Sequence, residues 1–190
     1  GGEAALSGIG PRHEPGAGLL LLLVLVDVFL HMRGMSEDHY VIATGRPGRD
    51  RLRVLTRVFA ETTTRLLDSV GVGQGMVCLD VGCGGGDVAT ELARRVGPNG
   101  RVVGIDLDSV ALDIAGQEAA DLGLDTIEYR TGDVFDLAES DRFDLVYARF
   151  LLSHLPNPPD ALQRMAASLA PGGMLVVEDV EFSAPFCFPA

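Results

Sequence analysis

The amino-acid sequence predicts an α/β protein with a doubly wound parallel sheet, and two observations lead to this expectation. Five short segments are predicted to be strands, at residues 77–81, 102–106, 126–130, 143–148 and 174–178, and the first two have the composition of buried strands. The first runs into a glycine-rich turn, and an amphipathic helix is expected directly after it, with an apolar face made of Val88, Leu92, Ala93 and Val96. A strand, a glycine turn and a helix N-terminus bring backbone N–H groups close to a bound ligand.

The spacing of the turn glycines narrows the class of ligand. They fall at Gly82, Gly84 and Gly86, whereas the dinucleotide fingerprint needs its third glycine at the position of Asp87. A phosphate-binding P-loop is excluded because the chain has no lysine. With Asp80 and Asp87 at its two ends, the turn suits a zwitterionic or cationic ligand. A turn that binds nothing is the simpler alternative, but three alternating glycines carry a large entropic cost.

Two further carboxylates follow later strands of the predicted sheet. Asp106 ends the second strand, where an acidic residue is placed to accept hydrogen bonds from both hydroxyls of a ribose. Asp133 follows the third strand and could accept a hydrogen bond from an adenine amino group, while the N–H of Val134 serves a ring nitrogen. The sequence therefore indicates an adenosine-containing ligand.

Together with these residues, five motifs of the sequence resemble those of the class I S-adenosylmethionine-dependent methyltransferases. VCLDVGCGGGD resembles their first motif and VVGIDLD their acidic second-strand motif. TGDVFDL resembles the adenine loop, FDLVYARFLLSHLPNP the fourth-strand motif and LAPGGMLVVED the fifth strand after its turn. The match covers about residues 76–179, and within the family it is most similar to small-molecule methyltransferases of ubiquinone and menaquinone biosynthesis.

The resemblance implies a Rossmann-like sheet with strand order 3-2-1-4-5. It implies methyl transfer from S-adenosylmethionine, with S-adenosylhomocysteine as the product, to a small-molecule acceptor by in-line displacement. The residues expected to bind the cofactor are Tyr40, Asp80, Gly82, Cys83, Gly84, Asp106, Leu107, Asp133, Val134, Ala148 and Arg149. An inactive cofactor-binding fragment or regulatory module is the alternative function, and a nicotinamide-dependent oxidoreductase is a more distant one.

His154 is the candidate for acid–base catalysis. It lies beyond the fourth strand, where the acceptor is expected, and an imidazole can take a proton near neutral pH. The alternative is that His154 only hydrogen-bonds the following loop and shapes the pocket wall. No metal site is expected, because the remaining histidines show no ligand spacing.

Composition excludes one class of partner and indicates a compartment. The net charge of −12 repels phosphate backbones, so no nucleic-acid partner is expected. Cys78, Cys83 and Cys187 are odd in number and lack metal-ligand spacing, which indicates a reducing, cytoplasmic compartment. Small size explains Cys83, between two loop glycines, better than a reactive thiol does.

The chain is expected to contain four parts, with boundaries at 34, 75 and 182. Residues 1–34 are predicted to be a disordered or loosely packed extension outside the family pattern, with Met35 resembling a natural start. Their apolar run, residues 19–30 interrupted at Asp27, is shorter than the roughly 20 residues that span a bilayer, so no stable membrane insertion is expected. A signal peptide is the alternative, although no small-x-small cleavage pattern follows.

The other three parts are a helical segment, the core and a tail. Residues 35–75 are expected to cover the cofactor site, with a helical stripe formed by Leu52, Leu55, Phe59, Leu66 and Val70. Residues 76–182 form the cofactor-binding core, and residues 183–190 form a truncated tail. Because the family's sixth and seventh strands are missing, the fifth strand is expected to expose an unpaired edge open to self-association.

Overall fold

The structure is a computed structural model that describes residues 20–26, 45–138 and 142–180. The helices are α1 (Gly45–Ser69), α2 (Asp87–Val96), α3 (Ser109–Asp121) and α4 (Pro158–Ala167). The strands are β1 (Leu20–Val26), β2 (Val77–Val81), β3 (Arg101–Asp106), β4 (Ile127–Thr131), β5 (Phe143–Arg149) and β6 (Leu169–Val180). Two single 3-10 turns, η1 (Val134–Asp136) and η2 (Leu152–His154), follow β4 and β5.

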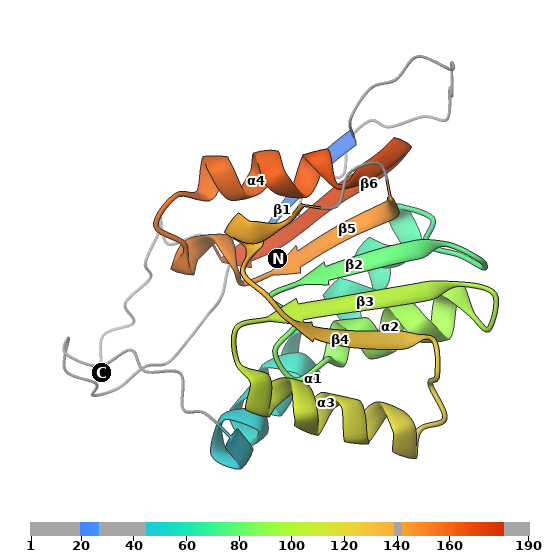
Figure 1. Ribbon diagram of the computed structural model, residues 1–190, viewed down its shortest axis with the longest axis vertical. Coiled ribbons are helices and arrows are strands. Elements are labelled where there is room, and N and C mark those ends of the chain that lie inside the picture. The colour runs from blue at the N-terminus through green and yellow to red at the C-terminus, as the bar shows by residue number, and fades with distance from the viewer. Residues whose placement is uncertain (1–19, 27–44, 139–141, 181–190) are drawn as a thin grey trace, which may run out of the picture.

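The strands form one parallel sheet with the order β1-β6-β5-β2-β3-β4 (Figure 1). The last five strands of the chain correspond to the predicted order 3-2-1-4-5, so the predicted fold class is confirmed. Parallel strands need long crossovers, and the helices between them supply these. The chain runs from β2 outwards through β3 to β4 and then returns to β5 on the other side of β2. This reversal opens a crevice beyond the carboxyl ends of β2 and β5, which is where ligands bind in such sheets.

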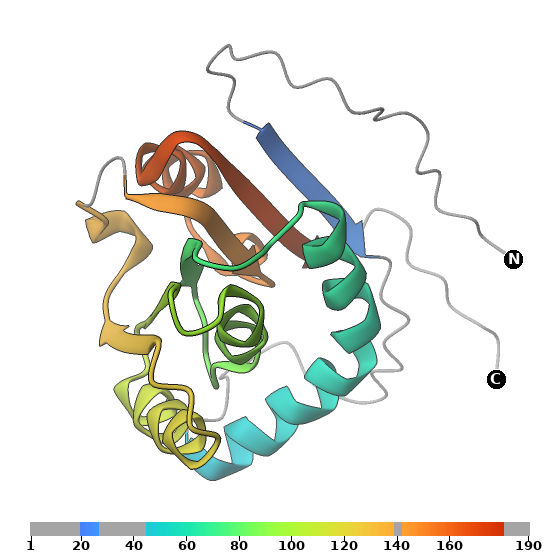
Figure 2. The same ribbon diagram turned by 90° about the vertical axis from the view of Figure 1, so that its right-hand side faces the viewer.

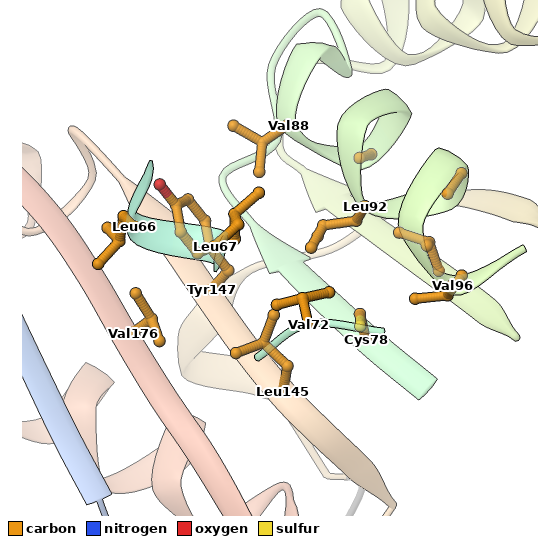
Figure 3. Close-up of a cluster of buried hydrophobic side chains, with 13 residues drawn as sticks. Leu66, Leu67, Val72, Cys78, Val88, Leu92, Val96, Leu145, Tyr147 and Val176 are labelled. Carbon is orange, nitrogen blue, oxygen red and sulfur yellow. The ribbon is translucent and has the colours of Figure 1, made fainter. Parts of the chain in front are cut away.

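Helices cover both faces of the sheet (Figures 1 and 2). On one face α1 and α2 bury an apolar cluster against the strands, with Leu67, Leu92 and Tyr147 fully enclosed (Figure 3). On the other face α4 packs Ala161 and Met165 against the sheet. Burial on both faces explains why inner strands such as β2 are largely apolar, whereas the edge strand β4 is only partly buried and contains charged residues.

Helices α3 and α4 begin where their local sequence provides a cap. Asp108 accepts hydrogen bonds from the N–H groups of Val110 and Ala111 at the start of α3. Asn157 caps α4 in the same way, with Pro158 in the first turn. Helix α2 confirms the predicted amphipathic segment, and its N-cap is a left-handed glycine without a capping side chain. The expected helical stripe lies in α1 from Leu52 to Leu66, and Val70 directly follows the last residue of the helix, Ser69.

The edge of β6 is covered by a segment from the beginning of the chain. Residues 20–26 form β1, which pairs in parallel with β6 from Leu20 opposite Met174 to Val26 opposite Val180. The prediction of an unpaired fifth-strand edge is therefore wrong, and the reason given for self-association through that edge no longer applies. Seven consecutive Leu and Val residues suit a strand of a parallel sheet as well as a membrane or signal segment. Among the described residues, no helix combines the length and the apolar character needed to cross a membrane.

Candidate functional site

The glycine-rich turn after β2 has a left-handed backbone at three positions. Gly82, Gly84 and Gly86 have φ angles of 69°, 50° and 76°, which other residues rarely adopt. The N–H groups of Gly82 and Cys83 donate to the carbonyl oxygen of Ile105 at 2.8 and 3.0 Å. These bonds fold the turn back onto the end of β3.

Two neighbours make side chains on these glycines hard to accommodate. A Cβ atom at Gly82 would lie 2.9 Å from Cδ1 of Leu151, on the side of the crevice. A Cβ atom at Gly86 would lie 2.2 Å from the hydroxyl oxygen of Tyr129, beneath the turn. The two glycines therefore allow Leu151 and Tyr129 to pack closely against the turn.

Asp80 lies at the end of β2 under the turn and is only 2% exposed. The backbone N–H of Ala89 donates a hydrogen bond to its carboxylate, so Asp80 takes the place of the missing cap at the start of α2. Its Oδ2 atom has no hydrogen-bond partner within the described part of the chain. Burial raises the pKa of Asp80 to about 7, against the opposing effects of Arg149 and the Ala89 N–H. This carboxyl group is therefore poised to change its charge near neutral pH.

Asp106 holds the turn from the end of β3. Its Oδ2 atom accepts a hydrogen bond of 2.8 Å from the N–H of Gly84, and its Oδ1 atom accepts one of 2.9 Å from the N–H of Asp108. Each carboxylate oxygen has two acceptor sites, so both oxygens keep capacity for a further donor. The arrangement fits a carboxylate that orders the glycine turn and also faces a polyhydroxylated ligand.

Asp133 starts the η1 turn beyond β4. Its Oδ1 atom accepts a hydrogen bond of 2.9 Å from the N–H of Phe135, which fixes the side chain at the start of the turn. Val134 follows and is buried. This carboxylate and the next backbone N–H thus lie at the same edge of the sheet as Asp106.

A pocket at the carboxyl edge brings together residues from four strand ends. Of the predicted cofactor residues it includes Gly82, Asp106, Leu107, Asp133 and Val134. It also includes residues that the sequence analysis missed, namely Val81, Ile105, Gly132, Leu151 and Leu155. Leu151 and Leu155 lie four positions apart in the same segment as His154. This spacing of two leucines is the feature of the sequence that could have indicated a pocket wall.

The remaining predicted residues lie around this pocket or outside the described part of the chain. Ala148 is fully buried at the end of β5, and Arg149 ends that strand. Cys83 lies within the turn, where burial raises the pKa of its thiol and suppresses its reactivity. His154 is exposed at the end of η2. Tyr40 lies outside the described residues.

A buried polar cluster joins α1 to the ends of β5 and β6, and no signal in the sequence analysis indicated it. Oε2 of Glu178 accepts hydrogen bonds from the hydroxyls of Thr63, at 2.8 Å, and of Tyr147. Nη1 of Arg149 donates a hydrogen bond of 3.2 Å to the hydroxyl oxygen of Thr63. Burial, followed by the charge of Glu178, raises the pKa of Tyr147 and keeps its hydroxyl protonated. The cluster fixes the position of α1 next to the site.

Within the described ranges, no group of three or more histidine, cysteine or acidic side chains is arranged to hold a metal ion. Both cysteines of these ranges, Cys78 and Cys83, are free.

Comparison with known sequences shows the family of this chain. The family model of a methyltransferase domain matches residues 73–187. The chain is 41% identical over 118 residues to a nocamycin O-methyltransferase from Saccharothrix syringae, covering 62% of this chain and 42% of that protein. It is 36% identical over 113 residues to a demethylmenaquinone methyltransferase from Staphylococcus aureus, covering 59% of this chain and 46% of the relative. The chain thus spans less than half the length of these curated relatives.

Solved structures agree with the observed fold. A SAM-dependent methyltransferase from Aquifex aeolicus superimposes with a TM-score of 0.60 and 25% identity, covering 67% of this chain and 68% of that one. A methyltransferase from Methanococcus maripaludis, at 22% identity, shares the fold with a TM-score of 0.62, covering 76% of this chain and 68% of the other. The chain belongs to the methyltransferase domain family, with the class I, Rossmann-like arrangement of the S-adenosylmethionine-dependent enzymes that it resembles.

Proposed function

We propose that this protein transfers the sulfonium methyl group of S-adenosylmethionine to a small organic acceptor. The observation that carries the proposal is the pocket in which the glycine turn meets Asp106 and Asp133. Two relatives of this chain are named for small organic acceptors, nocamycin and demethylmenaquinone. The net charge of −12 also disfavours a nucleic-acid acceptor.

The residues present fit such a cofactor. A side chain at Gly82 would collide with Leu151, so glycine at this position lets the wall of the pocket pack closely against the turn. Asp106 would accept from ribose hydroxyls, and Asp133 with the N–H of Val134 would hold the adenine. Aliphatic side chains at Leu107 and Leu155 line the same pocket, as a purine ring requires.

The methionine end is assigned to the buried side of the glycine turn. Asp80 has an oxygen without a partner among the described residues, and a carboxylate suits a ligand with an ammonium and a sulfonium group. The turn residues Gly82, Cys83 and Gly84 and the backbone at Ala148 and Arg149 would complete this part of the site. We also propose that Tyr40 is the aromatic residue that would close over the cofactor.

The chemistry requires positioning more than acid–base strength. When bound, the cofactor supplies an electrophilic methyl group whose bond to sulfur breaks as the acceptor forms its new bond, and the electron pair stays on sulfur. The protein would align the acceptor and exclude water, because a dry site favours a transition state in which charge is lost. His154 would take the proton of a hydroxyl or acidic-carbon acceptor.

We propose the cytoplasm as the compartment, since the described cysteines are free.

The test has a binding arm and a transfer arm. Calorimetry with S-adenosylmethionine and S-adenosylhomocysteine is expected to show one site per chain, and NADH is expected not to bind. A screen with radiolabelled methyl donor over quinol, phenol and amine acceptors is expected to find a labelled product. Absence of binding of both cofactor forms would refute the proposal. Binding without transfer to any acceptor would favour a cofactor-binding module without activity.

The role of His154 is tested in the same assay. His154→Gln is expected to lower turnover at saturating acceptor by about 10²-fold while S-adenosylhomocysteine affinity stays at the wild-type value. Full turnover in this variant would leave His154 only a role in shaping the pocket wall.

A further inference from the structure

The segment that leaves β5 forms one wall of the pocket. It contains η2 and supplies Leu151 and Leu155 to the lining. Leu151 is the side chain that a Cβ atom at Gly82 would meet at 2.9 Å. The position of this segment therefore sets the space between the glycine turn and the outer wall.

The path of the segment is strained and closely held at its start. Phe150 has a φ of 55°, the one positive value for a residue other than glycine within the described ranges. A bulky residue in this conformation is held there by its surroundings. Its N–H donates to the carbonyl oxygen of Glu178 at 2.8 Å, and its ring packs edge-on against Phe59 with ring centres 4.9 Å apart.

The middle of the segment is anchored by a carboxylate from β6. The N–H of Ser153 donates to Oδ2 of Asp179 at 3.1 Å, and Asp179 is only 5% exposed. Burying a carboxylate is unfavourable unless hydrogen bonds compensate it, so this residue is costly to keep for packing alone. Within η2, the N–H of His154 donates to the carbonyl oxygen of Leu151 at 3.0 Å. The anchor at Ser153 is thereby connected to the residue that faces Gly82.

We propose that Asp179 is a positioning residue that sets the affinity of the pocket for the cofactor by holding η2 against the glycine turn. The inference rests on the proposed function, because it concerns the same pocket. Asp179 would act through Leu151 and would not itself contact the ligand.

The chain offers a matched control at the amino-terminal ends of the strands, on the side of the sheet away from the pocket. The N–H of Val77 donates to Oδ2 of Asp144 at 2.8 Å, which ties the start of β2 to the start of β5. This is the same kind of carboxylate-to-backbone bond, but it lies away from the pocket. Asp144→Ala is therefore expected to lower the denaturation midpoint and to leave cofactor affinity unchanged.

The experiment measures S-adenosylhomocysteine affinity by calorimetry in the full chain, together with unfolding in urea. Asp179→Ala is expected to weaken binding by about tenfold, because the wall is no longer fixed. Asp179→Asn is expected to stay within about threefold of wild type, since its amide oxygen still accepts from Ser153. Leu151→Ala is expected to weaken binding to a similar extent as Asp179→Ala. The double variant is expected to lose less than the sum of both effects.

The outcomes separate this inference from the proposed function. Failure of the wild-type chain to bind would refute the proposed function itself. Wild-type binding together with unchanged affinity in Asp179→Ala would overturn the positioning role alone, as would equal weakening in Asp144→Ala. If Asp179→Ala does not fold, Leu151→Ala decides: its wild-type affinity would overturn the inference, and about tenfold weaker binding would support it.

Discussion

The N–H of Gly84 donates a hydrogen bond of 2.8 Å to Oδ2 of Asp106, across the gap between the turn after β2 and the end of β3. The carboxylate proposed to bind the ribose is thus also the group that orders the glycine turn. A change at Asp106 affects two properties of the site together.

Asp106→Ala is expected to reduce S-adenosylhomocysteine affinity by at least about 10²-fold, because hydrogen bonds to a charged group contribute about 1.5–3 kcal/mol each. Calorimetry measures the affinity. Asp108→Ala is the control, since it removes the cap of α3 two residues further on and is expected to cost about 1 kcal/mol of stability with little change in affinity. Similar affinity losses in both variants would contradict a specific role for Asp106.

The buried carboxyl group of Asp80 is expected to make stability depend on pH. Its pKa is raised from 3.8 to about 7 in the folded state, so between these values the folded protein holds a proton that the unfolded chain has lost. The free energy of unfolding therefore falls as the pH rises through this window. Asp80→Asn keeps an oxygen for the Ala89 N–H and removes this dependence.

Urea unfolding of wild type and Asp80→Asn at about pH 5 and about pH 8 measures the effect. The variant is expected to gain about 2–3 kcal/mol relative to wild type over that range. A stability difference that does not change with pH would show that Asp80 is ionised throughout.

The strands and the strand-end carboxylates could be predicted because they depend on short local patterns, whereas the order of the strands came from the resemblance to a family. Asp106 ends one strand and Asp133 comes two positions after the next, and parallel strands bring their carboxyl ends to one edge. The role of β1 could not be predicted in this way, because seven apolar residues fit a strand as well as a signal segment. Only the pairing with β6 distinguishes them.

The supporting side chains depend on packing between distant parts of the chain. Tyr129 reaches beneath Gly86 from β4, and Glu178 of β6 meets Thr63 of α1, across 115 positions of sequence. No periodicity or motif encodes such a contact. The sequence therefore indicated where a ligand binds, but not what holds that region in place.

Gly86 is expected to tolerate no side chain because of Tyr129. Gly86→Ala places a Cβ atom 2.2 Å from the Tyr129 hydroxyl oxygen and 2.9 Å from its ring carbon, at a φ of 76°. A loss of about 3 kcal/mol or more is expected, combining backbone strain with forced movement of the ring. Thermal or urea unfolding measures it.

Gly123→Ala is the matched control for backbone strain. Gly123 has a φ of 68° with no neighbouring atom within 4 Å, so only the left-handed cost of about 1–2 kcal/mol is expected. Equal losses at Gly86 and Gly123 would show that Tyr129 moves aside freely. Adding Tyr129→Phe to Gly86→Ala is expected to restore part of the loss, because the closest atom is removed.

The hydroxyl of Thr63 is expected to stabilise the packing of α1 on the sheet. Thr63→Val keeps the shape of the side chain but removes the donor to Oε2 of Glu178, whose Oε1 already lacks a partner among the described residues. A buried acceptor that loses a donor costs about 1–3 kcal/mol, so urea unfolding is expected to show a loss of that size. Thr62→Val, on the exposed side of the same helix, is expected to change stability by less than about 0.5 kcal/mol. If the two valine variants are equally stable, the Thr63–Glu178 bond contributes nothing net, and the apolar contacts of Leu66 and Leu67 alone would hold α1 beside the site.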